Sequence, residues 1–256
     1  MCLQFRRQEA AIVKNDPIMK AKLNFYSLLF LLFSVLANSQ EQKLTAQQII
    51  RNASKAFNEA PYITNNSNYN LYENYNSKKV YRNYTGIVLK KNNINYFKIK
   101  NTEFVSFKNI GIKINHDQKA IVIEKQKKST DESPLSLTNY LEAYNAKLIE
   151  TDKNNYICEL TPNKITQVML SKIVIHIRKK DYHIVKQILF FVEKMETKNA
   201  KGKSIYSTPR LEITFTPRQK NEKRDNILIS KENYFTEKGN ELVLSNKFST
   251  YQLFKS

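Results

Sequence analysis

The chain has 256 residues, and its 42 Lys and Arg residues outnumber 23 Asp and Glu residues, giving a net charge of +19. Only four glycines are present, which excludes the glycine-rich loops that hold nucleotide phosphates. A strongly basic surface favours acidic partners, such as anionic membrane surfaces or acidic glycans, although lysines also serve simply as a solvated surface.

The first element is an apolar run over residues 25–37, preceded by Lys20 and Lys22. It is shorter than the roughly 20 residues of a membrane-spanning helix. Small residues at Ala37 and Ser39 fit the cleavage site of a secretory signal peptide. A retained amphipathic or buried helix is the alternative interpretation.

We therefore expect residues 1–39 to be an N-terminal extension plus a signal peptide, with the true start at Met19 and cleavage after Ser39. The mature protein would be exported to the periplasm of a Gram-negative bacterium, with secretion as the alternative. The many Asn and Lys residues suggest the Bacteroidetes. Nucleic acid is not expected as a partner, because little of it is available to an exported protein.

Residues 40–256 form one predicted domain, because no long linker or internal repeat divides them. A helix opens this domain: Thr45 and Gln48 match the spacing of a capping box, apolar residues recur at helical spacing, and Pro61 ends the run. A second short helix is predicted within residues 134–145, where Ser136 is a possible N-cap and apolar residues fall on one side.

The rest of the domain alternates apolar and polar residues with the period of a β-strand. Polar turns separate the runs at short intervals, which is typical of an antiparallel meander. The predicted strands are 80–89, 95–100, 103–108, 110–114, 120–125, 147–151, 155–162, 171–179, 183–193, 209–217, 226–235 and 241–248, with 65–76 as a further candidate.

Few residues suggest catalysis. A two-residue turn at 179–180 would place His176 opposite His183, but zinc needs three or four protein ligands and no further ligand is apparent nearby, so no metal site is predicted. No nucleophile motif is present, and Cys158, in an apolar alternation, is expected to be a buried small side chain. We expect a protein that is not an enzyme; a hydrolase with dispersed carboxylates is the alternative.

Tyrosines crowd together with basic residues between residues 69 and 84, where Tyr81, Arg82 and Tyr84 lie on one predicted strand. Such a face is suited to binding glycan, lipid or a protein partner. It suggests a second possible function, that of a secreted structural or adhesion protein of the cell envelope. Ordinary cross-strand pairing also explains the tyrosines.

The order of these elements, with LTP at 160–162 and ITFTP at 213–217, resembles the LolA family of periplasmic carriers of outer-membrane lipoproteins. The resemblance covers most of residues 43–217. It implies a mainly β (α+β) fold, a curved antiparallel sheet forming an incomplete barrel closed by the N-terminal helix and the short helical insertion. It also implies a non-enzymatic carrier with an apolar cavity for lipid or lipoprotein acyl chains, an outer-membrane acceptor protein as partner, and no cofactor.

The family uses an arginine to hold a lid over its cavity, and Arg82 is a candidate only by position. Residues beyond Pro217 are a possible extension of the fold. Apolar positions on the alternating strands are the predicted cavity lining, although a filled core would use the same residues. These positions are Ile87, Leu89, Phe97, Ile99, Ile112, Ile114, Ile173, Ile175, Ile177, Ile213 and Phe215.

Overall fold

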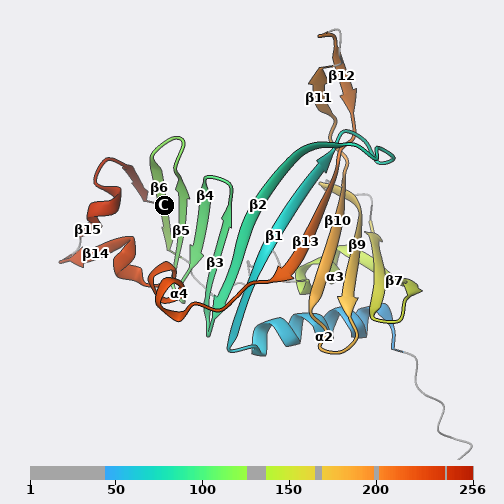
Figure 1. Ribbon diagram of the computed structural model, residues 1–256, viewed down its shortest axis with the longest axis horizontal. Coiled ribbons are helices and arrows are strands. Elements are labelled where there is room, and N and C mark those ends of the chain that lie inside the picture. The colour runs from blue at the N-terminus through green and yellow to red at the C-terminus, as the bar shows by residue number, and fades with distance from the viewer. Residues whose placement is uncertain (1–43, 126–136, 165–168, 199–201, 240, 256) are drawn as a thin grey trace, which may run out of the picture. The chain divides into compact units, whose positions relative to one another are not determined.

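The computed structural model describes residues 44–125, 137–164, 169–198, 202–239 and 241–255. The predicted signal peptide and the predicted cap Ser136 lie outside these residues. Most of the described chain forms one twelve-stranded sheet, whose strand order is β16-β6-β5-β4-β3-β2-β1-β13-β10-β9-β8-β7 (Figure 1). All neighbouring strands run antiparallel except β16 and β6, which are parallel. The sheet is therefore the predicted antiparallel meander, and it is open rather than closed into a barrel.

The strand boundaries agree with most of the predicted runs. The sheet contains β1 (Tyr62–Tyr72), β2 (Val80–Lys91), β3 (Ile94–Ile99), β4 (Thr102–Ser106), β5 (Ile110–Asn115), β6 (Ala120–Lys125), β7 (Tyr144–Thr151), β8 (Asn155–Pro162), β9 (Leu170–Arg178), β10 (Ile184–Phe191), β13 (Arg210–Pro217) and β16 (Gln252–Lys255). Two small hairpins stand apart from it, β11 (Met195–Lys198) with β12 (Ser204–Ser207) and β14 (Phe235–Lys238) with β15 (Glu241–Leu244).

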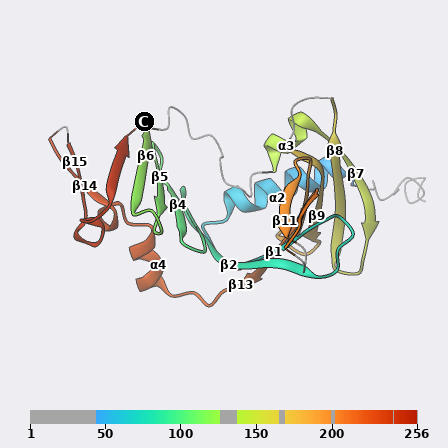
Figure 2. The same ribbon diagram turned by 90° about the horizontal axis from the view of Figure 1, so that it is seen from above.

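Helix α2 (Ala46–Glu59) begins at the predicted capping box. The Thr45 hydroxyl accepts a hydrogen bond from the Gln48 backbone N–H, and the Thr45 N–H donates to the Gln48 side chain. The helix contacts β7, β8 and β9, and Figure 2 shows it with α3 (Thr138–Ala143) on the inner side of the curved sheet. Both helices lie where the sequence predicted them. No helix among the described residues is long and apolar enough to cross a membrane.

The sheet carries hydrophobic cores on both faces. On the inner face, α2 and α3 cover β7–β10, and this core contains Ile49, Ile50, Leu137, Leu160 and Ile173. Cys158 is fully buried in the same core, as predicted, and burial raises the pKa of its thiol to about 11. This value keeps the thiol protonated and unreactive at neutral pH.

The second core lies on the outer face of β2–β6. The C-terminal segment, residues 218–255, covers this face with α4 (Glu222–Leu228), the 3-10 helices η1 (Lys231–Asn233) and η2 (Asn246–Phe248), and the β14–β15 hairpin. Tyr234, Phe235 and Phe248 are buried there against Leu89 and Ile114. The residues beyond Pro217 thus supply one side of this core, and the apolar outer face of β2–β6 supplies the other.

The predicted strand over residues 226–235 is wrong. Asn221 caps α4 by accepting a hydrogen bond from the Arg224 N–H, and Ser230 leads into η1. Each of these helices is only one or two turns long, so the apolar residues between 227 and 235 show no helical period. The β11–β12 hairpin was not predicted, because its strands are short and mostly polar.

Gly86 is required by close packing between β1, β2 and β3. A Cβ atom added there would lie 2.3 Å from the Lys98 carbonyl oxygen, 2.7 Å from Ser67 Oγ and 3.0 Å from the Tyr69 ring. We expect Gly86→Ala to lower the free energy of unfolding by about 1–3 kcal/mol, because β3 must move away. Chemical denaturation measures the change, and a value within about 0.5 kcal/mol of wild type would contradict this packing.

Candidate functional site

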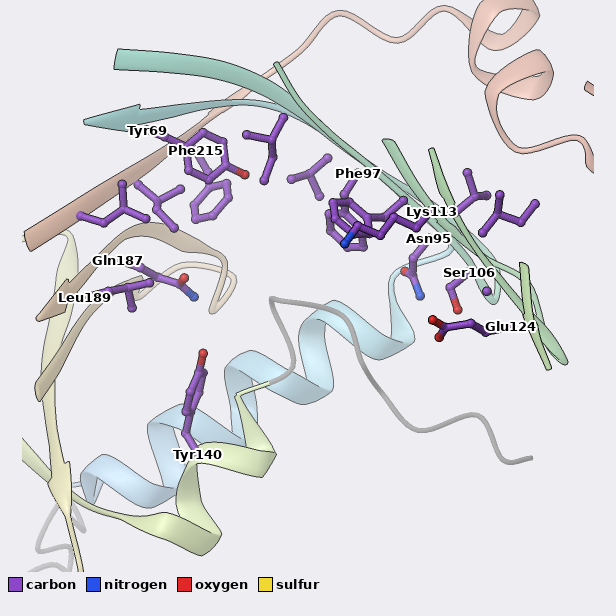
Figure 3. A pocket seen from close by; sticks show the side chains of 18 residues that line it. Tyr69, Asn95, Phe97, Ser106, Lys113, Glu124, Tyr140, Gln187, Leu189 and Phe215 are labelled. Carbon is purple, nitrogen blue, oxygen red and sulfur yellow. The ribbon is translucent and has the colours of Figure 1, made fainter. Parts of the chain in front are cut away.

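The concave face of the sheet holds a cavity of about 590 Å³. Figure 3 shows it between the sheet on one side and α3 on the other, with Tyr140 reaching in from the helix. This volume is many times that of one water molecule and lies within the range of small-molecule sites. The lining residues are Tyr69, Val88, Asn95, Phe97, Ile99, Phe104, Val105, Ser106, Gly111, Ile112, Lys113, Glu124, Tyr140, Gln187, Leu189, Leu211, Ile213 and Phe215.

Strand alternation produces this lining. Val88 pairs with Phe97, which pairs with Phe104, so these three side chains share the concave face. On the other side of β1, Ile213 pairs with Tyr69 and with Gln187. Aromatic and aliphatic side chains from six neighbouring strands therefore form one continuous apolar wall.

The two ends of the cavity differ in exposure. Lys113 and Glu124 are exposed and lie together with Phe104 at the β4–β6 end, where the Lys113 ammonium is 5.7 Å from the Phe104 ring. Gln187 is only 4% exposed and lies near Leu189 and Tyr140 at the other end (Figure 3). The cavity thus combines an apolar middle with polar groups at both ends.

Five of the eleven positions predicted as lining are at this cavity: Phe97, Ile99, Ile112, Ile213 and Phe215. Ile112 borders the cavity from its strand, but it pairs with Val105 and shares the outer face with Ile114, so its side chain packs into the outer core. The other six positions are not at the cavity, and they fall into two groups with different causes.

Ile87, Leu89 and Ile114 are on the outer face, under the C-terminal segment. The run Ile87-Val88-Leu89 is apolar on both faces, so alternation alone did not identify the inner residue, which is Val88. Val88, rather than Ile87 or Leu89, therefore lies on the concave face, because neighbouring residues of a strand point to opposite faces.

Ile173, Ile175 and Ile177 do face inward, but they are fully buried in the core beneath α2. The helix fills the concave space over β7–β9 and leaves the cavity farther along the sheet. Tyr69, Leu189 and Leu211 line it instead. Their alternation with polar neighbours was visible in the sequence, but the point at which α2 stops covering the sheet was not.

The tyrosine-rich region is split between several environments. Tyr84 pairs with Tyr69 across β1 and β2, and the Lys100 ammonium lies 5.9 Å from the Tyr84 ring. Arg82 is exposed, with its guanidinium 5.1 Å from the Tyr81 ring, and hydrogen bonds to Tyr84 and Tyr81 raise the pKa of Arg82. The three predicted residues Tyr81, Arg82 and Tyr84 are therefore grouped together, but none of them lines the cavity.

His176 and His183 are not opposed, because the two-residue turn at 179–180 that would pair them does not form. His176 pairs with Lys186, because the turn extends through Asp181 and Tyr182, whose φ is 56°. His183 instead lies 3.1 Å from the Asp181 carboxylate. Within the described residues, no group of three His, Cys, Asp or Glu side chains is placed to hold a metal ion.

A hydrogen-bonded chain of three side chains was not foreseen from the sequence. His116 Nε2 lies 2.8 Å from Glu103 Oε1, and His116 Nδ1 lies 2.8 Å from the Tyr251 hydroxyl. Burial raises the pKa of Glu103, but the bond to His116 and the nearby Lys98 lower it below its usual range on balance. Phe248 packs against the rings of His116 and Tyr251. The chain fastens the C-terminal segment to the outer face, away from the cavity.

Comparisons with known proteins find similarity at the level of solved structures. The sequence matches no family model and no curated protein. A LolA superfamily protein from Nitrosomonas europaea is 13% identical with a TM-score of 0.34, covering 74% of this chain and 99% of that chain. The chain is similar in fold to LolA superfamily proteins.

Two further structures are found at similar levels. A conserved protein from Thermus thermophilus is 9% identical with a TM-score of 0.43, over 82% of this chain and 99% of that chain. A chain of the Pseudomonas aeruginosa MucA/MucB complex is 10% identical with a TM-score of 0.38, over 78% of this chain and 62% of that chain.

Proposed function

We propose that this is an exported, non-enzymatic binding protein that holds the acyl chains of lipids or lipoproteins in its concave cavity. The observation that carries the proposal is the apolar wall of the cavity, formed by Val88, Phe97, Leu189, Ile213 and Phe215. Apolar surface open to water is costly, and an acyl chain would remove it from water.

The charge of the protein supports the same function. Residues 40–256 keep 37 of the 42 Lys and Arg residues and 21 of the 23 Asp and Glu residues, and their net charge of +16 favours contact with anionic lipid surfaces, from which acyl chains are drawn or to which they are delivered. Lys113 stands at the exposed end of the cavity, where its charge adds to the attraction toward such a surface. An outer-membrane acceptor protein fits this scheme as the recipient of the cargo.

Native mass spectrometry of protein purified without detergent tests the proposal. We expect bound lipid that is released on unfolding, and emptied protein that takes up the apolar fluorophore N-phenyl-1-naphthylamine. Protein that is always empty and leaves the fluorophore unbound would refute acyl-chain binding.

A second candidate function is binding of a glycan or protein partner in the cell envelope. The observation that favours it is the exposed guanidinium of Arg82, held beside Tyr81 and Tyr84. Other tyrosines of the same region are engaged internally: Tyr75 hydrogen-bonds to Ser171, and Arg210 stacks on Tyr72 at 4.2 Å. The surface left for a partner is therefore small compared with the cavity.

A further inference from the structure

The side chain of Gln187 is a buried polar group without a partner. It is 4% exposed, and its Nε2 atom has no hydrogen-bond partner within the part of the chain that the structure describes. Buried polar groups in proteins are nearly always hydrogen-bonded, so each exception calls for an explanation. Figure 3 shows the amide end of Gln187 pointing into the cavity rather than into the core.

The protein around Gln187 offers the amide little to bind. Its cross-strand neighbours on the same face are Ile175 on β9 and Ile213 on β13, both apolar. Two residues along β10, Leu189 also lines the cavity. The free N–H groups of Gln187 are therefore directed at the space that a ligand would occupy.

Tyr140 brings a second donor to the same end of the cavity. Its hydroxyl reaches from α3 toward the side of the cavity where Gln187 lies (Figure 3). Burial and the nearby Tyr144 raise the pKa of Tyr140, so its hydroxyl keeps its proton at neutral pH. Both groups can donate hydrogen bonds to one acceptor atom.

We propose that Gln187 binds the carbonyl oxygen of the acyl linkage, so that the cavity encloses the linkage as well as the hydrocarbon chain. This inference rests on the proposed function and narrows its ligand class to acyl rather than alkyl chains. The acceptor is uncharged, because Lys113, the one cation among the lining residues that the structure describes, lies at the other end of the cavity. A carboxylate or phosphate buried beside Gln187 would lack a counter-charge.

A matched pair of uncharged probes tests this inference. Methyl hexadecanoate and methyl hexadecyl ether differ only in the carbonyl group, and both can displace N-phenyl-1-naphthylamine from the full-length mature protein. We expect wild type to bind the ester on the order of tenfold more tightly, the worth of about one hydrogen bond. Gln187→Met, which keeps the length of the side chain but donates no hydrogen bond, should lose most of this preference, because among the described residues only the Tyr140 hydroxyl remains as a donor at this end of the cavity.

Gln252→Met is the control, because Gln252 is exposed on β16 and does not line the cavity. It should keep the preference for the ester. Equal binding of the two probes by wild type would overturn the role of Gln187 and leave acyl-chain binding standing. Binding of neither probe would overturn both. The comparison of the two probes on wild type tests the role of Gln187 even if a variant does not fold. Thermal melting should show that Gln187→Met is at least as stable as wild type, because the substitution removes a buried unpaired amide.

Discussion

Leu189→Trp is expected to weaken acyl-chain binding more than tenfold while leaving the protein folded. The side chain of Leu189 points into the cavity (Figure 3) and is only partly buried, so an indole ring can extend into the space that the chain would fill. A tryptophan in an open cavity does not cause the strain that it would cause in a densely packed core, so Leu189→Trp should still fold. The loss of binding would then come from the cavity volume that the indole ring occupies. Displacement of N-phenyl-1-naphthylamine by methyl hexadecanoate measures it.

Ile188→Trp is the matched control. Ile188 is the preceding residue of β10, so its side chain lies on the opposite face of the sheet, where it pairs with Glu212. Ile188 and Leu189 have a similar degree of burial, and both substitutions add about the same volume. We expect Ile188→Trp to bind the acyl chain within twofold of wild type. Such a factor corresponds to a free energy smaller than the usual effect of a surface substitution. Equal effects of the two tryptophans would show that binding does not take place on the concave face.

Asp225→Ala is expected to cause the largest loss of stability, about 3–5 kcal/mol in the free energy of unfolding. Asp225 is fully buried and joins the C-terminal segment to β1. Arg218 Nη2 donates to its carboxylate at 2.6 Å, and the Tyr62 hydroxyl donates to the other oxygen. Arg218 also binds Thr64 on β1, through Nε at 2.8 Å. Removing the carboxylate leaves a buried guanidinium without its counter-charge.

The control for Asp225 is Glu222→Ala on the same helix. Glu222 and its partner Lys220 are both exposed, with 68% and 54% of their side chains accessible, so their ion pair should contribute less than about 1 kcal/mol. Urea denaturation of the two variants gives the comparison. Similar losses for Asp225 and Glu222 would show that the C-terminal segment is not held by this buried network.

The same network makes stability depend on pH. Burial raises the pKa of Asp225, but hydrogen bonds from Tyr62 and Arg218 outweigh it and hold the pKa below its usual range. The stabilisation is therefore complete above about pH 4, the ordinary pKa of an aspartate, and is lost as the pH falls through the folded-state value. In Asp225→Asn, this part of the acid destabilisation should disappear.

The local fold was largely readable from the sequence. The capping box of Thr45 and Gln48 located α2, and period-two alternation located the strands from β2 to β10 and β13. These features depend on near neighbours in the chain, which is why the sequence reveals them. The role of residues 218–255 was not readable, because it depends on which face of a distant part of the sheet remains uncovered.

The candidate site was only partly predictable for the same reason. Phe97, Ile213 and Phe215 were expected at the cavity and lie there. Leu89 and Ile175 show equally regular alternation, yet one lies beneath the C-terminal segment and the other beneath α2. Whether an inward apolar residue meets a helix, a chain segment or empty space is decided by tertiary packing. Gln187 gave no signal at all, since a single polar residue in a strand normally marks a solvent-facing position.

Photolabelling with an acyl chain that carries a diazirine near the middle of the chain would test most directly whether this cavity holds the ligand. After irradiation and proteolysis, we expect the labelled peptides to contain the cavity residues of β3, β10 and β13, such as Phe97, Leu189 and Ile213. Unlabelled methyl hexadecanoate should compete for this labelling. Labels confined to the C-terminal segment or to the outer face of the sheet would contradict acyl-chain binding in the concave cavity.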